Sequence, residues 1–218
     1  MNTNSNNKAS YRISLCCGIK ESECPNLIYQ DQNLYQDLEA VLLNSGWPQC
    51  LEEKLDRQIK PLDQFSISVS GCPNGCSRPQ IADFGLIQAE HPAVIEDACT
   101  GCAECAQVCK EAAIDLQTGV ASVDPGYCLY CGHCIRACPE GALYSVVKGY
   151  RVQVGGKLGR HPRLGDELPG IKSRDQVLQI LEVCLEMHTR YYRSGIRFGQ
   201  VMAEQGLERL YALLRDKQ

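Results

Sequence analysis

The stretch GCPNGCSRP, residues 71 to 79, places Cys72 and Cys76 four residues apart around a Pro-Asn-Gly turn. Apolar residues alternate with serines in the segment that leads into it, residues 65 to 70, and this pattern predicts a half-buried strand. The two glycines of the turn would let a bulky cofactor approach the backbone closely. Two thiolates cannot complete a four-coordinate site, so this stretch requires two further ligands from elsewhere in the chain.

Cysteine is the unusual component of the composition. The chain has 218 residues, of which 15 are cysteines, and it is 44% hydrophobic and 22% charged. These values are typical of a globular protein with one or two domains. Residues 1 to 10 are polar and are expected to form a disordered tail rather than a signal peptide, and no apolar run is long enough to span a membrane. We therefore expect a cytoplasmic protein whose cysteines bind metal rather than form disulfides.

An internal repeat supplies most of the cysteines. The segment CTGCAECAQVCKEAAIDL, residues 99 to 116, aligns at an offset of 29 residues with CLYCGHCIRACPEGALYS, residues 128 to 145. Each half reads C-x2-C-x2-C-x3-C, in which the three thiolates of one loop bind three irons of a cubane cluster. The fourth ligand comes from the other half of the repeat, because the chain turns away after the third cysteine.

This repeat resembles the bacterial two-cluster ferredoxins over about 50 residues. The resemblance implies two 4Fe-4S clusters. Their ligands would be Cys99, Cys102, Cys105 and Cys138 for the first cluster and Cys128, Cys131, Cys134 and Cys109 for the second. Lys110 departs from the family, which usually has proline there. The alternative is a pair of structural zinc sites, but these usually combine two separated C-x2-C pairs. We expect His133, inside the second loop, to face solvent, because thiolates already fill every coordination position.

Four further segments extend the resemblance to nearly the whole chain. They are CCGIKESEC (16 to 24), DFGLI (83 to 87), GGKLGRHPRL (155 to 164) and RSGIRFGQVMAEQGLERL (193 to 210). Together with GCPNGCSRPQIADFGLI, the most specific part, they resemble the siroheme-containing nitrite and sulfite reductases, in particular the anaerobic and dissimilatory branch, in which a ferredoxin module is inserted. The resemblance runs from Ile13 to Leu214.

In that family a further 4Fe-4S cluster is held by an upstream C-x5-C pair and a downstream C-x3-C pair. The resemblance makes Cys72 and Cys76 ligands, and makes Cys76 the thiolate that bridges the cluster to the siroheme iron. The upstream pair departs from the pattern, because six residues separate Cys17 from Cys24. Cys24 takes the place of the second ligand, and the first is either Cys17, which we favour, or Cys16.

The remaining candidates are basic or apolar. The segment with Lys157, Arg160 and His161 is either a solvated hairpin or a site for anions, and the resemblance places a similar stretch at the siroheme, whose carboxylates suit arginine. The residues expected at the siroheme are Asn74, Cys76, Arg78, Lys157, Arg160 and Arg163, of which Cys76, Lys157 and Arg160 are the catalytic candidates. Cys50 and Cys184 lie on apolar sides of helical segments, and we expect buried structural thiols there.

The expected fold is α+β, a sulfite-reductase-like half-domain interrupted by a ferredoxin-like insert with two 4Fe-4S clusters. The half-domain would comprise residues 11 to 89 and 148 to 218, and the insert residues 90 to 147. Its sheet, mixed or antiparallel, would contain strands at 65 to 70, 84 to 87 and 151 to 154 under a layer of helices. One expected helix begins near Leu34, a short one lies around residues 51 to 55, and a long one begins at Ser173, where Gln176 completes a capping box. A final helix carries Leu207, Leu210, Tyr211 and Leu214.

Two functions fit this pattern. The first is a siroheme oxidoreductase that reduces sulfite, nitrite or a related oxyanion with electrons that pass from the ferredoxin clusters through the Cys-bridged cluster. The second is a multi-cluster electron-transfer protein or subunit without its own substrate. The sequence resembles only the second half of a full reductase, so we expect a homodimer or a subunit of a larger complex.

The partners follow from the charge and from one missing motif. The net charge is −4 before any cluster is counted, so nucleic acid is not an expected partner. The segment GGKLG lacks the strand, the glycine spacing and the helix of a dinucleotide site. The expected reductant is therefore another protein, such as a ferredoxin.

Overall fold

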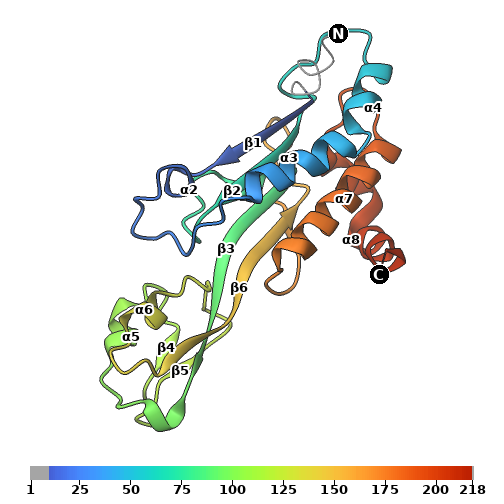
Figure 1. Ribbon diagram of the computed structural model, residues 1–218. Helices are drawn as coiled ribbons and strands as arrows, with labels where there is room; N and C mark the ends of the chain where they lie inside the picture. The colour runs from blue at the N-terminus through green and yellow to red at the C-terminus, as the bar shows by residue number, and fades with distance from the viewer. Residues whose placement is uncertain (1–9, 218) are drawn as a thin grey trace.

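The computed structural model describes residues 10 to 217, in which the chain forms two lobes joined by a pair of long strands (Figure 1). Nearly all of the tail expected at residues 1 to 10 lies outside the described residues. Within residues 10 to 217, no helix is both long and apolar enough to cross a membrane.

The large lobe contains a five-stranded mixed sheet in the order β1-β2-β3-β6-β7. Its strands are β1 (Tyr11–Leu15), β2 (Phe65–Ser70), β3 (Phe84–Val94), β6 (Leu143–Val154) and β7 (Asp166–Glu167). The first three run parallel, and β6 pairs antiparallel with both β3 and β7. The expectation of an α+β fold with a mixed sheet is confirmed.

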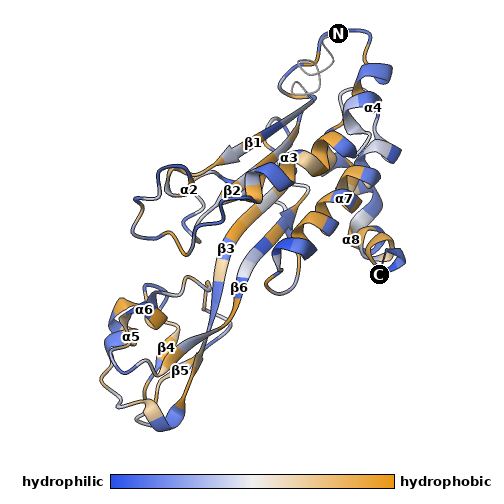
Figure 2. Ribbon diagram, in the orientation of Figure 1, coloured by the Kyte–Doolittle hydropathy of each residue, from blue (hydrophilic) through white to orange (hydrophobic). Residues whose placement is uncertain are grey.

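Four helices pack on one face of this sheet, with their apolar sides toward it (Figures 1 and 2). They are α3 (Leu34–Asn44), α4 (Trp47–Lys54), α7 (Arg174–Tyr191) and α8 (Phe198–Asp216). Leu38, Trp47 and Leu181 in this layer have no exposed surface. Burial of each such side chain contributes about 1.5–3 kcal/mol relative to an exposed position, so this layer supplies most of the core.

The predicted helices are all present, although some begin or end at residues other than those predicted. The Ser173 hydroxyl accepts from the Gln176 N–H, and the Ser173 N–H donates to the Gln176 side chain at 2.9 Å, which completes the predicted capping box of α7. Helix α8 begins at Phe198 and contains Leu207, Leu210 and Leu214, which the sequence assigned to a final helix. Gly206, with φ of 75°, interrupts α8, and buried residues lie on both sides of this break, such as Met202 before it and Leu210 after it.

The prediction that β2 is half-buried is wrong. All six of its residues are buried, including the serines on the face away from the helices. The chain after the GCPNGC loop folds back over this face. There the Ser66 hydroxyl donates to Asp83 at 2.6 Å and the Ser68 hydroxyl donates to the Ser77 carbonyl oxygen at 2.6 Å. Small hydroxyls on this face therefore satisfy buried polar groups rather than water.

The small lobe is carried on an extension of the strand pair β3–β6. The sequence predicts strands only at 84 to 87 and 151 to 154, but pairing continues from Phe84–Val154 as far as Val94–Leu143. The predicted insert boundaries, 90 and 147, fall inside these strands, next to an irregularity between His91 and Pro92. The lobe itself holds α5 (Glu104–Val108), β4 (Ile114–Asp115), β5 (Ser122–Val123) and α6 (His133–Ala137).

Candidate metal centres

The cysteines of the repeat lie around two separate cavities. The first cavity is small and lies at the far end of the small lobe. Its lining includes Cys99, Cys102, Cys105 and Cys138. The second has a volume of about 240 Å³, and its lining includes Cys109, Cys128, Cys131 and Cys134. These are the two groups of four that the crossed pattern of the repeat assigns to two clusters.

Local backbone geometry brings the third cysteine of each loop inward. Helices α5 and α6 each follow a residue in the left-handed conformation, Ala103 with φ of 65° and Gly132 with φ of 69°. This conformation turns the chain sharply, so that the helix starts inside the loop. Cys105 and Cys134, in the first turn of these helices, are buried in the core of the small lobe. Two equivalent turns thus present two equivalent loops of thiols.

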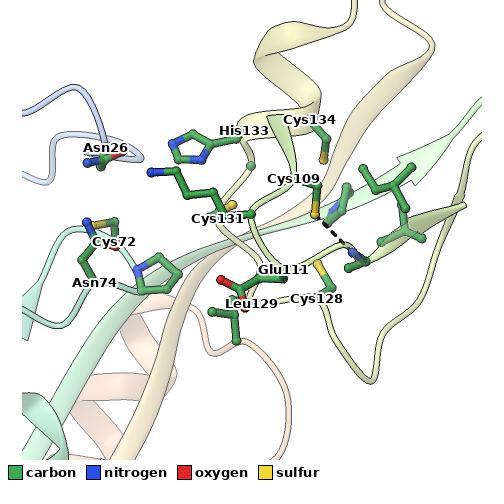
Figure 3. Close-up of a pocket in the computed structure, with 17 residues that line it drawn as sticks. Asn26, Cys72, Asn74, Cys109, Glu111, Cys128, Leu129, Cys131, His133 and Cys134 are labelled. Carbon is green, nitrogen blue, oxygen red and sulfur yellow. Dashed lines mark hydrogen bonds between the residues drawn. The ribbon is translucent and has the colours of Figure 1, made fainter. Parts of the chain in front are cut away.

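The second cavity lies between the lobes (Figure 3). Asn26, Cys72 and Asn74 line it from the large lobe, opposite the thiols of the small lobe. The resemblance places Asn74 at a macrocycle, whereas the structure places it in this interlobe cavity. His133 also lines the cavity and is partly buried, and its pKa is lowered by burial and by the charges of Arg136 and Lys110. A neutral imidazole beside four thiols adds no competing positive charge.

A third group of cysteines lies at one edge of the sheet. The parallel strands β1 and β2 end together, with Leu15 opposite Val69, so the residues that follow them meet. The Cys16 N–H donates to the Val69 carbonyl oxygen at 3.0 Å, and the Gly71 N–H approaches the Cys16 sulfur at 3.3 Å. Burial raises the pKa of Cys72, and the neighbouring thiols of Cys24, Cys76 and Cys16 raise it further.

This geometry favours Cys16 over Cys17, the residue that the sequence favoured. Cys16 is the buried N-cap of α2 (Cys17–Glu21), whereas Cys17 is the first residue of that helix and is exposed. Adjacent side chains at a helix start point in different directions, so only one of the two can join the group. A Cβ on Gly18 would come within 2.7 Å of the Cys24 Cβ and lie 3.9 Å from the Cys16 sulfur, so this glycine leaves room for Cys24 close to Cys16.

Burial makes several of these thiols weak acids. It raises the pKa of Cys134 to about 12, and it also raises the pKa of Cys72, Cys105 and Cys128. Such thiols stay protonated at neutral pH until a metal displaces the proton. Metal binding at these sites would therefore release protons and be favoured by a higher pH during assembly.

The spacing of the cysteine groups bears on whether they could hold single zinc ions. In the described part of the chain, no three side chains of His, Cys, Asp or Glu converge closely enough to hold one metal ion. A single zinc requires its four ligands within about 2.3 Å of one point. The thiolates of a cubane lie farther apart, because each binds a different iron.

A basic cavity of about 200 Å³ lies on the sheet face opposite the helices. Arg12, Arg78 and Arg197 line it together with serines of β1 and β2 and with Ser77, which follows Cys76 directly. Arg197 donates to the buried Asp83 at 2.8 Å, which fixes its position. Among residues 10 to 217, neither Arg12 nor Arg78 has a side-chain partner, so both guanidinium groups are free to bind an anion.

Sequence reasoning identified only Arg78 of these three. A signal for Arg12 was available, because it alternates with Tyr11 and Ile13 in β1 and so lies on the opposite face from these apolar residues. The sequence around Arg197 carried no such pattern. Arg197 lies far from β2 along the chain, and only the tertiary fold brings its guanidinium to the Ser66 hydroxyl of that strand.

The predicted basic hairpin contributes less than expected to this cavity. Its Leu158 lines the cavity, but Lys157, Arg160 and Arg163 do not. The Lys157 ammonium donates to Gln200 at 3.1 Å, and Arg163 is paired with Asp166. Arg160 and His161 are exposed at the hairpin tip. Their assignment to a siroheme stays a prediction.

Three cysteines lie outside the groups of four: the exposed Cys17, and Cys50 and Cys184, which are buried, as predicted. Cys184 on α7 has no exposed surface, and Cys50 on α4 is 6% exposed. Burial raises the pKa of both thiols. They belong to the core between the helices and the sheet, away from the three groups of four.

The family model described as nitrite and sulphite reductase 4Fe-4S domain matches residues 10–218 of this chain. The chain belongs to this family. The family description names a 4Fe-4S domain, so membership supports an iron–sulfur cluster in this chain.

Two curated relatives come from Methanocaldococcus jannaschii. The coenzyme F420-dependent sulfite reductase is 39% identical over 128 residues, which are 59% of this chain and 20% of the relative. An uncharacterized protein is 25% identical over 214 residues, which cover 96% of this chain and 67% of that protein. The chain thus spans a fifth of the relative that has an assigned activity.

A solved structure shows the same fold. The crystal structure of dissimilatory sulfite reductase I superposes with a TM-score of 0.61 at 21% identity, over 94% of this chain and 52% of that one. At this identity the similarity establishes the arrangement of helices and strands. This chain corresponds to about half of that protein.

Proposed function

We propose that this protein is an iron–sulfur oxidoreductase that holds three 4Fe-4S clusters in a row. The observation that carries the proposal is the division of twelve cysteines into three groups of four. Two of these groups line separate cavities, one in the small lobe and one between the lobes, and the third gathers at the edge of the large-lobe sheet. Cys72 of the third group also lines the second cavity, so the second cluster would lie between the other two.

The ligands of the two small-lobe clusters are those of the ferredoxin-like pattern, which makes residues 90 to 147 a ferredoxin-like insert. The third cluster takes Cys16, Cys24, Cys72 and Cys76. Each cluster supplies one-electron storage when it is bound. The chain contributes burial and backbone N–H groups at sulfur, such as that of Ala113 at 3.3 Å from Cys109, and such contacts tune reduction potentials.

Siroheme fits the basic cavity in part. Three arginines and several serines suit its carboxylates, and Ser77 places the cavity beside Cys76. Its volume of about 200 Å³, however, is below the roughly 300 Å³ at which pockets for drug-sized ligands begin. One chain therefore provides part of a siroheme pocket, and a second copy or another subunit would provide the rest. Bound there, siroheme would supply the iron at which an oxyanion is reduced.

The substrate that we propose is sulfite, with nitrite as the alternative. Both ions would be attracted by the free guanidinium groups of Arg12 and Arg78. The name of the 39% identical relative favours sulfite, and the family includes enzymes for both ions. We further propose that the protein works in the cytosol and takes electrons from another protein, such as a ferredoxin.

The second candidate function is an electron-transfer subunit without a substrate of its own. The small volume of the basic cavity favours it, because a chain that holds only part of a siroheme pocket cannot act alone. In this case the three clusters would deliver electrons to a catalytic partner.

Iron content and absorption spectra separate these functions. The protein would be purified without oxygen from a host that makes siroheme, and iron would be counted per chain. About 13 irons together with siroheme bands support the reductase, and sulfite and nitrite reduction would then be assayed. About 12 irons without siroheme bands support the electron-transfer subunit. About 8 would show that the third group of cysteines holds no cluster.

A further inference from the structure

Glu90 is a buried carboxylate at the junction of the two lobes, and none of the proposed cluster or siroheme sites uses it. It lies on β3 and is only 3% exposed. The pairing of β3 with β6 shifts register directly after it, between His91 and Pro92. A β-bulge bends a strand, so Glu90 lies where the strand pair leaves the large lobe and enters the small one.

Two cations from different segments neutralise this carboxylate. Lys148 on β6 reaches one oxygen at 2.9 Å, and Arg136 on α6 reaches the other at 3.4 Å. The Glu90 side chain is 4% exposed, whereas those of Lys148 and Arg136 are 53% and 40% exposed. A buried carboxylate without its partners would be strongly unfavourable, so these pairs tie α6 and β6 to β3.

Further contacts converge on the loop around Cys131. The Glu90 N–H donates to the Tyr130 carbonyl oxygen at 2.7 Å, and Glu90 forms an isolated parallel bridge with Cys131. Arg136 also donates to the Cys131 carbonyl oxygen at 3.0 Å. Gly132 lies against the carboxylate, where a Cβ would come within 2.3 Å of its oxygen. One side chain and its backbone thus hold three consecutive residues of the second loop.

The strand that carries Glu90 also leads back to the GCPNGC loop. Cys131 and Cys72 line the same cavity from opposite lobes, as Figure 3 shows. We propose that Glu90 is a positioning residue, which holds the loop of the second cluster against β3 and so sets the separation between that cluster and the Cys72 cluster. This inference rests on the proposed function. Because electron tunnelling falls exponentially with distance, a loosened junction would slow transfer between the two clusters.

Glu90→Gln is the variant that tests this role, because it keeps the side-chain volume and the backbone contacts but removes the charge that holds both cations. Holo-protein would be reduced rapidly and followed by EPR spectroscopy, to measure the magnetic coupling between the two reduced clusters and the rate at which the Cys72 cluster gains its electron. We expect full iron content, weaker magnetic coupling and electron transfer that is several-fold slower, because tunnelling falls exponentially with the distance between the clusters.

Two further variants keep the test decisive. Arg136→Gln removes one of the two partners at a partly exposed position and should give the same changes to a smaller degree. Glu208→Gln, an exposed carboxylate on α8, is the matched control and should behave as wild type. If Glu90→Gln holds all its iron and matches wild type in coupling and rate, the positioning role is wrong. Loss of iron from the second cluster in both variants would also overturn it, since Glu90 would then act in cluster assembly. Wild-type protein with fewer than about 12 irons would instead refute the proposed function itself.

Discussion

Replacement of Cys16 or Cys17 by serine distinguishes the two ways of completing the third cluster that we propose. Cys16 is buried, and its sulfur lies 3.3 Å from the Gly71 N–H, next to the GCPNGC loop. Cys17 is exposed at the start of α2. Serine is nearly the same size as cysteine but does not bind iron in this setting. We therefore expect Cys16→Ser to lose the third cluster and Cys17→Ser to keep it.

The size of the effect follows from the grouping of the thiols. With twelve ligands in three groups of four, removal of one ligand should lower the iron content from about 12 to about 8 atoms per chain and leave the small-lobe clusters in place. The serine hydroxyl still offers an acceptor to the Gly71 N–H, so the stability of the rest of the fold should change by about 1 kcal/mol or less.

Iron and acid-labile sulfide would be measured on anaerobic protein, with EPR spectra of the reduced clusters to identify which signal is lost. Cys50→Ser, at a buried thiol outside all three groups, is the control for a change in the core. Equal iron content in wild type and Cys16→Ser, or loss of iron only in Cys17→Ser, would show that the burial and orientation of the Cys16 side chain do not identify the ligand.

Three further predictions concern the stability of the large lobe. Burial lowers the pKa of His188 to about 3, so its proton is bound more weakly in the folded state than in the unfolded state, where the pKa is about 6.5. The stability that this neutral histidine contributes is complete above pH 6.5 and is lost as the pH falls. The free energy of unfolding should drop by about 2 kcal/mol between pH 7.5 and 5. Urea unfolding of His188→Phe should lack this pH dependence. Gly85→Ala would place a Cβ 2.2 Å from the Pro79 carbonyl oxygen, so the free energy of unfolding should fall by about 1–3 kcal/mol. Gly126→Ala is the control and should stay close to wild type, because its Cβ would meet only an Asp124 side-chain oxygen at 3.1 Å. Ser173→Ala removes the capping box of α7 and should cost about 1 kcal/mol in thermal unfolding, and an unchanged midpoint would show that the cap adds nothing.

Spacing along the chain determined which cysteines could share a cluster in the small lobe. The ligand loops C-x2-C-x2-C are local, and their geometry depends on a few consecutive backbone angles, such as those of Ala103 and Gly132. The amphipathic helices and the capping box at Ser173 are local in the same sense. Such features can be read from the sequence because their physical causes lie within one or two turns of chain.

The grouping of cysteines at the edge of the sheet could be seen only in the tertiary structure. Cys16 and Cys17 are neighbours in sequence, and only the parallel alignment of β1 with β2 decides which of them faces the GCPNGC loop. The burial of the serines on β2 likewise depends on the segment that folds back over them after Cys76. A strand pattern records which residues alternate, but it does not record what covers each face.

The basic cavity and the lobe junction show most clearly what a sequence pattern does not record. Arg12 and Arg197 meet at one cavity from opposite ends of the chain, and Glu90 meets Arg136 and Lys148 across two lobes. The sequence by itself determined the chemistry of this protein, because cysteine spacing is a local property of the chain. Its tertiary structure alone decided how the three groups of thiols and the arginines are placed relative to one another, because those distances are set by the packing of segments that are far apart in sequence.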